Sequence, residues 1–220
     1  MRAARRERGY GGLSVLHKGK FRCVGMSDTG RIREHNEDTI GTDADIGLVV
    51  LADGMGGYKA GEVASGIAVR TVMSLVKEAV EREDLALRDP ETGMSRSGIL
   101  LRDAIHRANK IIYQTAKTQA NCEGMGTTVV AGIFFDDRLT VAHVGDSRLY
   151  CLRGAEFRQV TQDHSLLQEL VSRGFYTPEE AHRAAAKNYV TRALGVEPTV
   201  DVDVTEVPVS KDDLYLLCSD

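Results

Sequence analysis

The chain has 220 residues, which allows one ordinary domain with a large core and leaves little room for a second. Apolar residues make up 42% and charged residues 27%, a balance that excludes long-range disorder but selects no function. The net charge of −4 gives no electrostatic reason to bind nucleic acid, and no apolar run approaches the roughly 20 residues that a membrane span requires.

The N-terminal segment is basic and Gly-rich, and no apolar stretch follows it that could serve as a signal peptide. We expect residues 1–20 to form a flexible, solvated tail, with contact to an acidic partner or a lipid surface as the alternative. Residues 21–220 are then the folded domain. The four cysteines are widely spaced, which predicts reduced thiols rather than a disulfide framework or a zinc site, in a cytoplasmic protein.

The first half of the chain predicts three strands followed by two helices. Strands are expected at residues 21–27, 39–43 and 46–52, and the last is a continuous apolar run typical of a buried strand. Residues 88–98 carry Pro, Gly and Ser and predict the loop between the helices. Each helix has an apolar stripe, namely Ala64, Ala68, Val72, Leu75 and Ala79 in the first and Leu101, Ile105, Ala108, Ile112 and Ala116 in the second.

The second half returns to strands. Residues 127–135 and 139–144 flank the hairpin signal Asp136-Asp137, and residues 148–153 are expected to continue the same sheet. Helices are predicted at 165–173, capped by Thr161 or Asp163, and at 177–186, and strands at 200–207 and 213–218. Strands, two helices and further strands, without strict alternation, indicate an α+β fold.

Acidic residues recur beside glycine or serine where strands are expected to end. Asp53-Gly54 follows the buried strand, Asp146 follows the strand that ends at residue 144, and Asp220 closes the chain. Asp38 stands near the start of the domain, five residues after Arg33. Each element alone has a plain reading as a turn or a helix cap, and Asp-Gly after an apolar strand is a common hairpin turn. Together they favour a carboxylate site.

Oxygen ligands without grouped histidines select hard cations, Mg²⁺ or Mn²⁺, over zinc or copper. Several carboxylates around one small site suit a two-metal centre, with the ions roughly 3.5–4 Å apart. Arg33 beside such a centre fits a phosphoryl group, because a guanidinium can bind two phosphate oxygens at once. The residues therefore predict metal-assisted hydrolysis of a phosphate ester.

Eight motifs in register resemble those of the PP2C-like (PPM) Ser/Thr protein phosphatases in their short bacterial form, and the match runs from about residue 21 to 220. They are Ser27-Asp28-Thr29-Gly30, Arg33 with Asn36-Glu37-Asp38, Ala52-Asp53-Gly54-Met55-Gly56-Gly57, Gly124-Met125-Gly126-Thr127-Thr128, Val144-Gly145-Asp146-Ser147-Arg148, Thr161-Gln162-Asp163-His164-Ser165, Thr191-Arg192-Ala193-Leu194-Gly195 and Leu217-Cys218-Ser219-Asp220. The resemblance implies a four-layer α-β-β-α sandwich of two antiparallel sheets with flanking helices.

The resemblance also implies a metal-binding role for five residues. Asp53 would bridge two ions, Gly54 would donate its carbonyl oxygen, and Asp220 would bind the first ion. Asp38 would act on the ions indirectly, through a bound water, and Asp146 would bind a third, weaker ion. Two Mg²⁺ or Mn²⁺ ions are therefore expected, with a third of lower affinity.

The activity implied is hydrolysis of phosphoserine and phosphothreonine on proteins, by direct attack of a metal-bridging hydroxide. Arg33 would bind the substrate phosphate, and residues 175–190 would form a flap that shapes access. Met55 stands where some eukaryotic members have a histidine proposed as general acid, so leaving-group protonation has no assigned residue. His164, beside a predicted helix start, is interpreted as a cap or packing residue. The partners implied are phosphoproteins and a Ser/Thr kinase, and we expect a monomer.

The sequence departs from the family pattern at Asp220. There the family motif normally continues, with a helix, a further Asp ligand and a closing strand. We therefore expect the C-terminal part of the domain to be missing from these 220 residues. The rival hypothesis is a non-catalytic phosphoprotein-binding or regulatory module. A third candidate, hydrolysis of small phosphorylated metabolites, would use the same metal chemistry.

Overall fold

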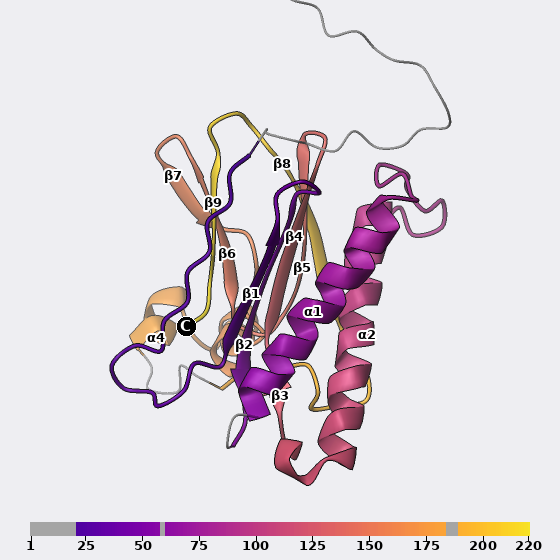
Figure 1. The fold of residues 1–220 in the computed structure, drawn as a ribbon. Helices are drawn as coiled ribbons and strands as arrows, with labels where there is room; N and C mark the ends of the chain where they lie inside the picture. Colours follow the sequence, from indigo (N-terminus) through magenta and orange to yellow (C-terminus); the bar gives the residue numbers. More distant parts are fainter. Residues whose placement is uncertain (1–20, 58–59, 184–188) are drawn as a thin grey trace, which may run out of the picture.

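The computed structural model describes residues 21–57, 60–183 and 189–220 (Figure 1). Two antiparallel β-sheets face each other, and two long helices pack side by side against the first sheet. The expected α+β sandwich of two antiparallel sheets is thus confirmed. The proposed tail, residues 1–20, lies outside the described residues.

The first sheet has the order β1-β2-β4-β5-β8, and the short β3 extends it by pairing with the end of β2. The Asp136-Asp137 hairpin is confirmed, with Asp136 in the left-handed region at φ 51°. The bounds are β1 Asp38–Asp43, β2 Leu48–Met55, β3 Gly126–Thr127, β4 Val129–Phe135, β5 Arg138–Val144 and β8 Asp203–Pro208.

Strand β2 corrects one expectation. Asp53 was predicted to end its strand, but β2 continues for two further residues because Gly54 and Met55 pair with β3, beyond the part of β2 that pairs with β4. Asp53-Gly54 is therefore strand backbone rather than the tip of a hairpin. The Asp53 carboxylate therefore projects from a paired strand rather than from a turn.

Helix α1 runs from Ala60 to Val80 and helix α2 from Arg96 to Thr118, followed by the short 3-10 helix η1 at Ala120–Cys122. Ser95 caps α2, because its Oγ accepts a hydrogen bond from the Gly98 amide at 3.1 Å. The predicted stripes face the core as expected, and their central members are fully buried. Both helices thereby seal the outer face of the first sheet.

The second sheet has the order β7-β6-β9, with β6 Arg148–Arg153, β7 Glu156–Gln159 and β9 Leu214–Cys218. The expectation that residues 148–153 continue the first sheet is wrong, because β6 pairs only with β7 and β9 among the described strands. Strand β7 was not predicted. All four of its residues are exposed, so it carries no alternation of buried and exposed positions that a pattern could reveal.

Three smaller expectations also change. No strand forms at residues 21–27. Helix α3, Leu166–Ser172, is capped by Ser165 rather than by Thr161 or Asp163. Helix α4 spans Pro178–Arg183, and its start is a reciprocal cap in which Thr177 and Glu180 each bond the other's backbone amide with a side chain. The rest of the segment predicted as helix reaches into residues 184–188, outside the described part.

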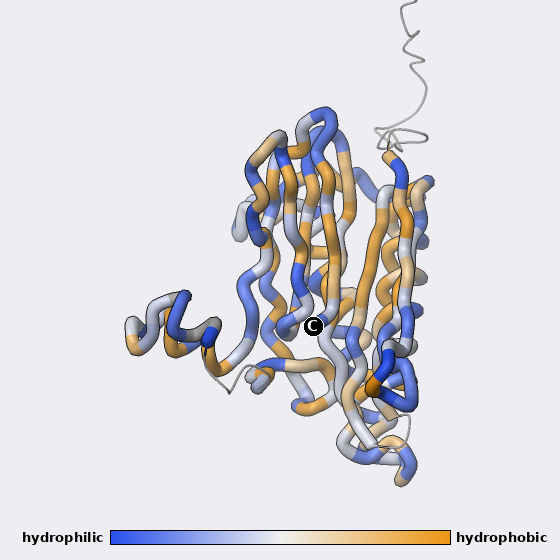
Figure 2. Tube along the Cα trace, turned by 90° about the vertical axis from the view of Figure 1, so that its left-hand side faces the viewer, coloured by the Kyte–Doolittle hydropathy of each residue, from blue (hydrophilic) through white to orange (hydrophobic). Residues whose placement is uncertain are grey.

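The core has two clusters. The larger lies between the first sheet and the helices, and the smaller lies between the sheets, where side chains from β2, β4, β5, β6 and β8 meet. Figure 2 shows hydrophobic colour running along the strands and hydrophilic colour gathering in the loops at their ends. All four cysteines are free thiols, as predicted. No helix among the described residues is long and apolar enough to cross a membrane.

Candidate metal centre

Two carboxylates meet across the first pair of strands. Asp38, the first residue of β1, is the register partner of Asp53 on β2. Directly opposed residues of antiparallel strands project from the same face of a sheet. The two side chains therefore leave the sheet together, at the end where the chain also terminates (Figure 1).

Two further aspartates complete the group. Asp220, at the end of the chain, shares a hydrogen bond with the Asp53 carboxyl group. Its neighbour Ser219 donates a hydrogen bond to Asp38 Oδ2 at 3.0 Å. Asp146, in the turn after β5, lies near enough for the charge of Asp220 to raise its pKa. Four of the predicted site residues thus come from three separate parts of the chain to one place.

Burial and mutual repulsion perturb the carboxyl groups. Burial is the largest cause that raises the pKa of Asp53 to about 7, followed by the charges of Asp38 and Asp220, the hydrogen bond with Asp220 and the charge of Asp146. The pKa of Asp146 is also raised, by burial first and by Asp220 second. Such a group is unfavourable when fully ionised and becomes favourable when a cation lies within it. The donor set of carboxylate oxygens fits Mg²⁺ or Mn²⁺.

Gly54 sits where no side chain fits. A Cβ on Gly54 would lie 2.0 Å from the carbonyl oxygen of Gly61, in the first turn of α1, and 2.8 Å from that of Glu37. The Gly54 amide donates to the Glu37 carbonyl at 3.1 Å, and the Ser65 hydroxyl donates to the same oxygen at 2.6 Å. Glycine is thus required for α1, β2 and the start of β1 to approach one another beside Asp53.

Two threonines hold the Asp53 backbone. The Asp53 amide donates to Thr128 Oγ1 at 3.0 Å, and the Asp53 carbonyl accepts from the Thr128 amide at 2.9 Å and from Thr127 Oγ1 at 2.8 Å. The Thr128 hydroxyl also bonds the hydroxyl of Ser147, next to Asp146, at 2.7 Å. Both threonines are buried. The Thr128 side chain thereby connects the backbone of Asp53 to the residue next to Asp146.

The sequence places these threonines within a family motif but indicates no role for them. The signal was present, since adjacent hydroxyl residues at the start of an otherwise apolar strand must find buried partners. Their partners could not be named, because the contacts join positions about 75 residues apart. The threonines position the backbone of the site rather than supplying charge to it.

Arg33 is not bonded to any of the four carboxylates. It lies in the exposed loop before β1, and it makes no hydrogen bond or ion pair with any described residue. The structure therefore brings together four of the predicted carboxylates and Gly54, but it leaves the guanidinium without a fixed place among them. A free guanidinium close in sequence to Asp38 remains available to an anionic ligand.

Two antiparallel sheets with four converging carboxylates at one end define a protein built to bind hard divalent cations. The comparisons identify the class. The sequence pattern of the Protein phosphatase 2C family matches residues 31–220. The chain is 43% identical over 197 residues to the serine/threonine phosphatase stp of Listeria monocytogenes, an alignment that covers 88% of this chain and 75% of that one.

Solved structures agree. The chain matches the crystal structure of the Mycobacterium tuberculosis serine/threonine phosphatase PstP/Ppp with a TM-score of 0.75 at 36% identity, covering 88% of this chain and 76% of that one. It matches the catalytic domain of PstP in complex with two manganese ions with a TM-score of 0.70 at 37% identity, covering 89% and 75%. The chain belongs to the Protein phosphatase 2C family.

Proposed function

We propose that this chain is a metal-dependent protein phosphatase that hydrolyses phosphoserine and phosphothreonine. The observation that carries the proposal is the convergence of Asp38, Asp146 and Asp220 on Asp53, whose pKa is raised to about 7. Family membership and the relatives named as Ser/Thr phosphatases support the same activity. The manganese-bound relative supports Mg²⁺ or Mn²⁺ as the cofactor.

The carboxylates would hold the cations. Asp53 is central because the other three act on it, and Asp220 and Asp146 are the neighbours whose charges interact with each other. The Gly54 carbonyl is proposed as a further oxygen ligand. Asp38 accepts a hydrogen bond from Ser219 and is proposed to support the site through water rather than as a direct ligand. When bound, divalent cations would lower the pKa of a coordinated water towards 7 and would polarise the phosphoryl oxygens.

The remaining steps belong to the chain's own residues. The free guanidinium of Arg33 is proposed to bind two oxygens of the substrate phosphate and to orient phosphorus towards the carboxylate cluster. The buried threonines behind Asp53 fix its backbone, so that the cluster needs little rearrangement when substrate binds. The segment 175–190, which includes α4, is proposed to shape access to the site.

Physiological context follows from the same chemistry. Phosphoprotein substrates imply a Ser/Thr kinase that supplies them, and we propose such a kinase as a functional partner. Four free thiols support a reducing, cytoplasmic location. We also propose that the chain acts as a monomer, with residues 1–20 as a tail outside the phosphatase domain of residues 21–220.

The direct test is hydrolysis of a phosphothreonine peptide by the purified chain with Mn²⁺, with and without a chelator. Phosphate release is expected with Mn²⁺ and not with the chelator. A sugar phosphate serves as the parallel substrate, and a higher kcat/KM for it would replace the proposal by metabolite hydrolysis. Binding of the phosphopeptide without any metal-dependent release would instead support the non-catalytic module.

A further inference from the structure

The two strands that flank the turn with Asp146 do not pair with each other. The turn joins β5 of the first sheet to β6 of the second, so the strands diverge. Gly145 has a φ of 105°, and a Cβ there would lie 2.7 Å from the Thr128 side chain. A backbone in this conformation needs specific partners to hold it, because it is not part of a hairpin ladder.

Four consecutive residues shortly after β7, residues 161–164, supply those partners. Each one bonds a different position around the turn. The Leu149 amide donates to Thr161 Oγ1 at 3.0 Å, His143 Nε2 bonds the Gln162 carbonyl at 2.8 Å, the Arg148 guanidinium bonds both Asp163 oxygens, and the His164 amide donates to the Gly145 carbonyl at 2.9 Å.

His164 makes a second bond to the same glycine. The Gly145 amide donates to His164 Nδ1 at 3.1 Å, so one residue satisfies both backbone polar groups of Gly145. On its other side, the His164 carbonyl accepts from the Thr191 amide at 2.9 Å. His164 is therefore fixed between the chain that follows residues 175–190 and the glycine directly before Asp146.

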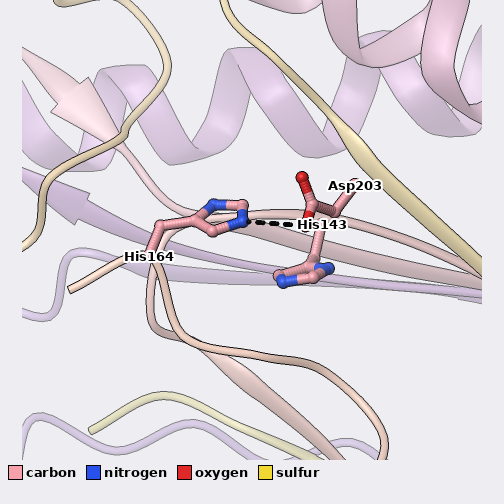
Figure 3. A group of neighbouring side chains, drawn as sticks. All are labelled: His143, His164 and Asp203. Carbon is pink, nitrogen blue, oxygen red and sulfur yellow. Dashed lines mark ion pairs between the residues drawn. The ribbon is translucent and has the colours of Figure 1, made fainter. Parts of the chain in front are cut away.

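The hydrogen bond to Gly145 also fixes the tautomer of His164. A ring nitrogen that accepts an amide proton has no proton of its own, so the proton of the neutral ring is on Nε2. Nε2 lies 3.4 Å from Asp203 Oδ2 (Figure 3). Arg192 bonds the other oxygen of Asp203 at 2.8 Å. Burial, the ring of His143 and the charge of Arg192 all lower the pKa of His164, which favours the neutral ring.

The same arrangement excludes a metal ion between His143, His164 and Asp203. Their candidate ligand atoms lie within 4.8 Å of one another, a spacing that by itself suits a metal. However, the His164 nitrogen that faces the group carries a proton and has no lone pair to offer. Arg192 Nη1 lies 3.1 Å from that nitrogen, but a protonated Nε2 cannot accept from it, so the guanidinium donates to Asp203 Oδ1 and the Asp201 carbonyl instead. Its positive charge would also repel a cation. The group is a hydrogen-bonded support for one ring.

We propose that His164 is a positioning residue, which holds Asp146 in place for metal binding through its Nδ1 bond to Gly145, with Asp203 orienting the ring. The proposal rests on the proposed role of Asp146 as a metal ligand. Partners that orient metal ligands typically contribute 10–100-fold to metal affinity. Loss of the Nδ1 acceptor should therefore weaken Mn²⁺ binding without removing any ligand atom.

The test compares three variants with the wild type. His164→Leu keeps the volume and removes the acceptor, whereas His164→Asn places an amide oxygen close to the position of Nδ1. Asn109→Leu is the matched control, because Asn109 is also buried and its Oδ1 accepts from another glycine amide, that of Gly195, at 2.7 Å. Mn²⁺ is titrated against phosphopeptide hydrolysis, and amide hydrogen exchange is measured in the metal-free protein.

His164→Leu is expected to raise the Mn²⁺ concentration for half-maximal turnover about tenfold or more and to accelerate exchange of the Gly145 amide. His164→Asn should restore most of both properties. Asn109→Leu should lower Tm but change neither the Mn²⁺ concentration for half-maximal turnover nor the exchange of the Gly145 amide. An equal rise in the Mn²⁺ requirement in Asn109→Leu, or unchanged Gly145 exchange in His164→Leu, would overturn the proposal.

A substitute variant and a metal-independent measurement complete the test. If His164→Leu does not fold, Asp203→Ala replaces it, because Asp203 is on the surface and its loss frees both the His164 ring and the Arg192 guanidinium. A few-fold rise in the Mn²⁺ requirement is expected, and no change refutes the proposal. Hydrogen exchange needs neither metal nor turnover. An inactive wild type would refute the proposed phosphatase function, while the exchange of Gly145 would still decide whether His164 holds the turn.

Discussion

Asp38 and Asp53 are directly opposed on neighbouring antiparallel strands, with their carboxyl groups on one face of the sheet. Like charges in this relationship destabilise a sheet. Here the penalty is increased by burial and by Asp220, which raise the pKa of Asp53 to about 7. The metal-free protein therefore carries electrostatic strain that a cation between the carboxylates would relieve.

The first prediction is that Asp53→Asn abolishes Mn²⁺-dependent turnover while the fold is retained. The neutral amide removes repulsion from Asp38 and Asp220, so the metal-free variant should unfold at the same temperature as the wild type or a few degrees higher. Mn²⁺ should raise the Tm of the wild type but not that of the variant. Calorimetry with chelator and with Mn²⁺ measures both effects.

Asp137→Asn is the control for this change, because Asp137 is exposed at the tip of the β4–β5 hairpin, at the opposite end of β5 from the turn that carries Asp146. It should leave turnover and the Mn²⁺-induced shift unchanged. Retained turnover in Asp53→Asn would remove Asp53 from its central place.

The second prediction concerns the close approach of α1 and β2. Gly54→Ala would bring a methyl group to 2.0 Å from the Gly61 carbonyl oxygen, which is backbone and cannot rotate away. Overpacking of this kind costs about 1–3 kcal/mol, so Tm should fall by several degrees and Mn²⁺ activation should weaken. Gly57→Ala is the matched control, because its methyl group would meet nothing within 4 Å. Equal Tm values for the two variants would contradict the prediction.

Much of the architecture could be predicted because its signals are local. The buried strand at residues 48–52 and the helix stripes of α1 and α2 follow from hydrophobic periodicity, and Asp136-Asp137 follows from turn chemistry. The family motifs also located four of the aspartates that meet at the site. Their proximity could be expected from resemblance but not from spacing, because the contact between Ser219 and Asp38 joins positions 181 residues apart.

What the sequence could not predict depends on distant partners. Strand β7 is exposed throughout and lacks alternation, so only its pairing with β6 reveals it. Asp163 fits the residue preferences of a helix cap, yet its carboxylate binds Arg148 of β6 instead, and Ser165 caps α3. Asp53 was expected to end its strand, but its pairing with Asp38 of β1 and the pairing of Gly54 and Met55 with β3 keep it within β2.

The third prediction is that Arg33 acts on substrate and not on stability. Arg33→Ala should lower kcat/KM for a phosphothreonine peptide by about 10–100-fold, because hydrogen bonds to a charged group contribute roughly 1.5–3 kcal/mol. Tm should be unchanged, since Arg33 makes no hydrogen bond or ion pair within the described residues. Arg31→Ala, two positions away and equally exposed, controls for loss of charge. Equal losses in both variants would mean that general electrostatic attraction, rather than a specific contact, explains the effect.

The fourth prediction concerns stability against pH. Asp213, just before β9, accepts hydrogen bonds from Arg153 Nε at 2.9 Å and Nη2 at 2.7 Å, from the Ser210 amide at 2.8 Å and from the Tyr215 hydroxyl at 3.1 Å. The Arg153 guanidinium is the largest cause that holds the pKa of Asp213 well below its usual range. A depressed pKa in the folded state means that the ionised carboxylate stabilises the fold.

That stabilisation is complete above about pH 4, the ordinary pKa of an aspartate, and is lost progressively as the pH falls below it. Asp213→Asn should therefore lower Tm by several degrees at pH 7, and the gap to the wild type should narrow as the pH is taken from 4 towards 2. Both proteins are measured with chelator, so that the carboxylates around Asp53 titrate equally in each. Asp212→Asn is the control, because Asp212 is exposed and its φ of 69° suits asparagine. A gap that stays constant from pH 7 to pH 2 would show that Asp213 contributes through packing rather than through its charge.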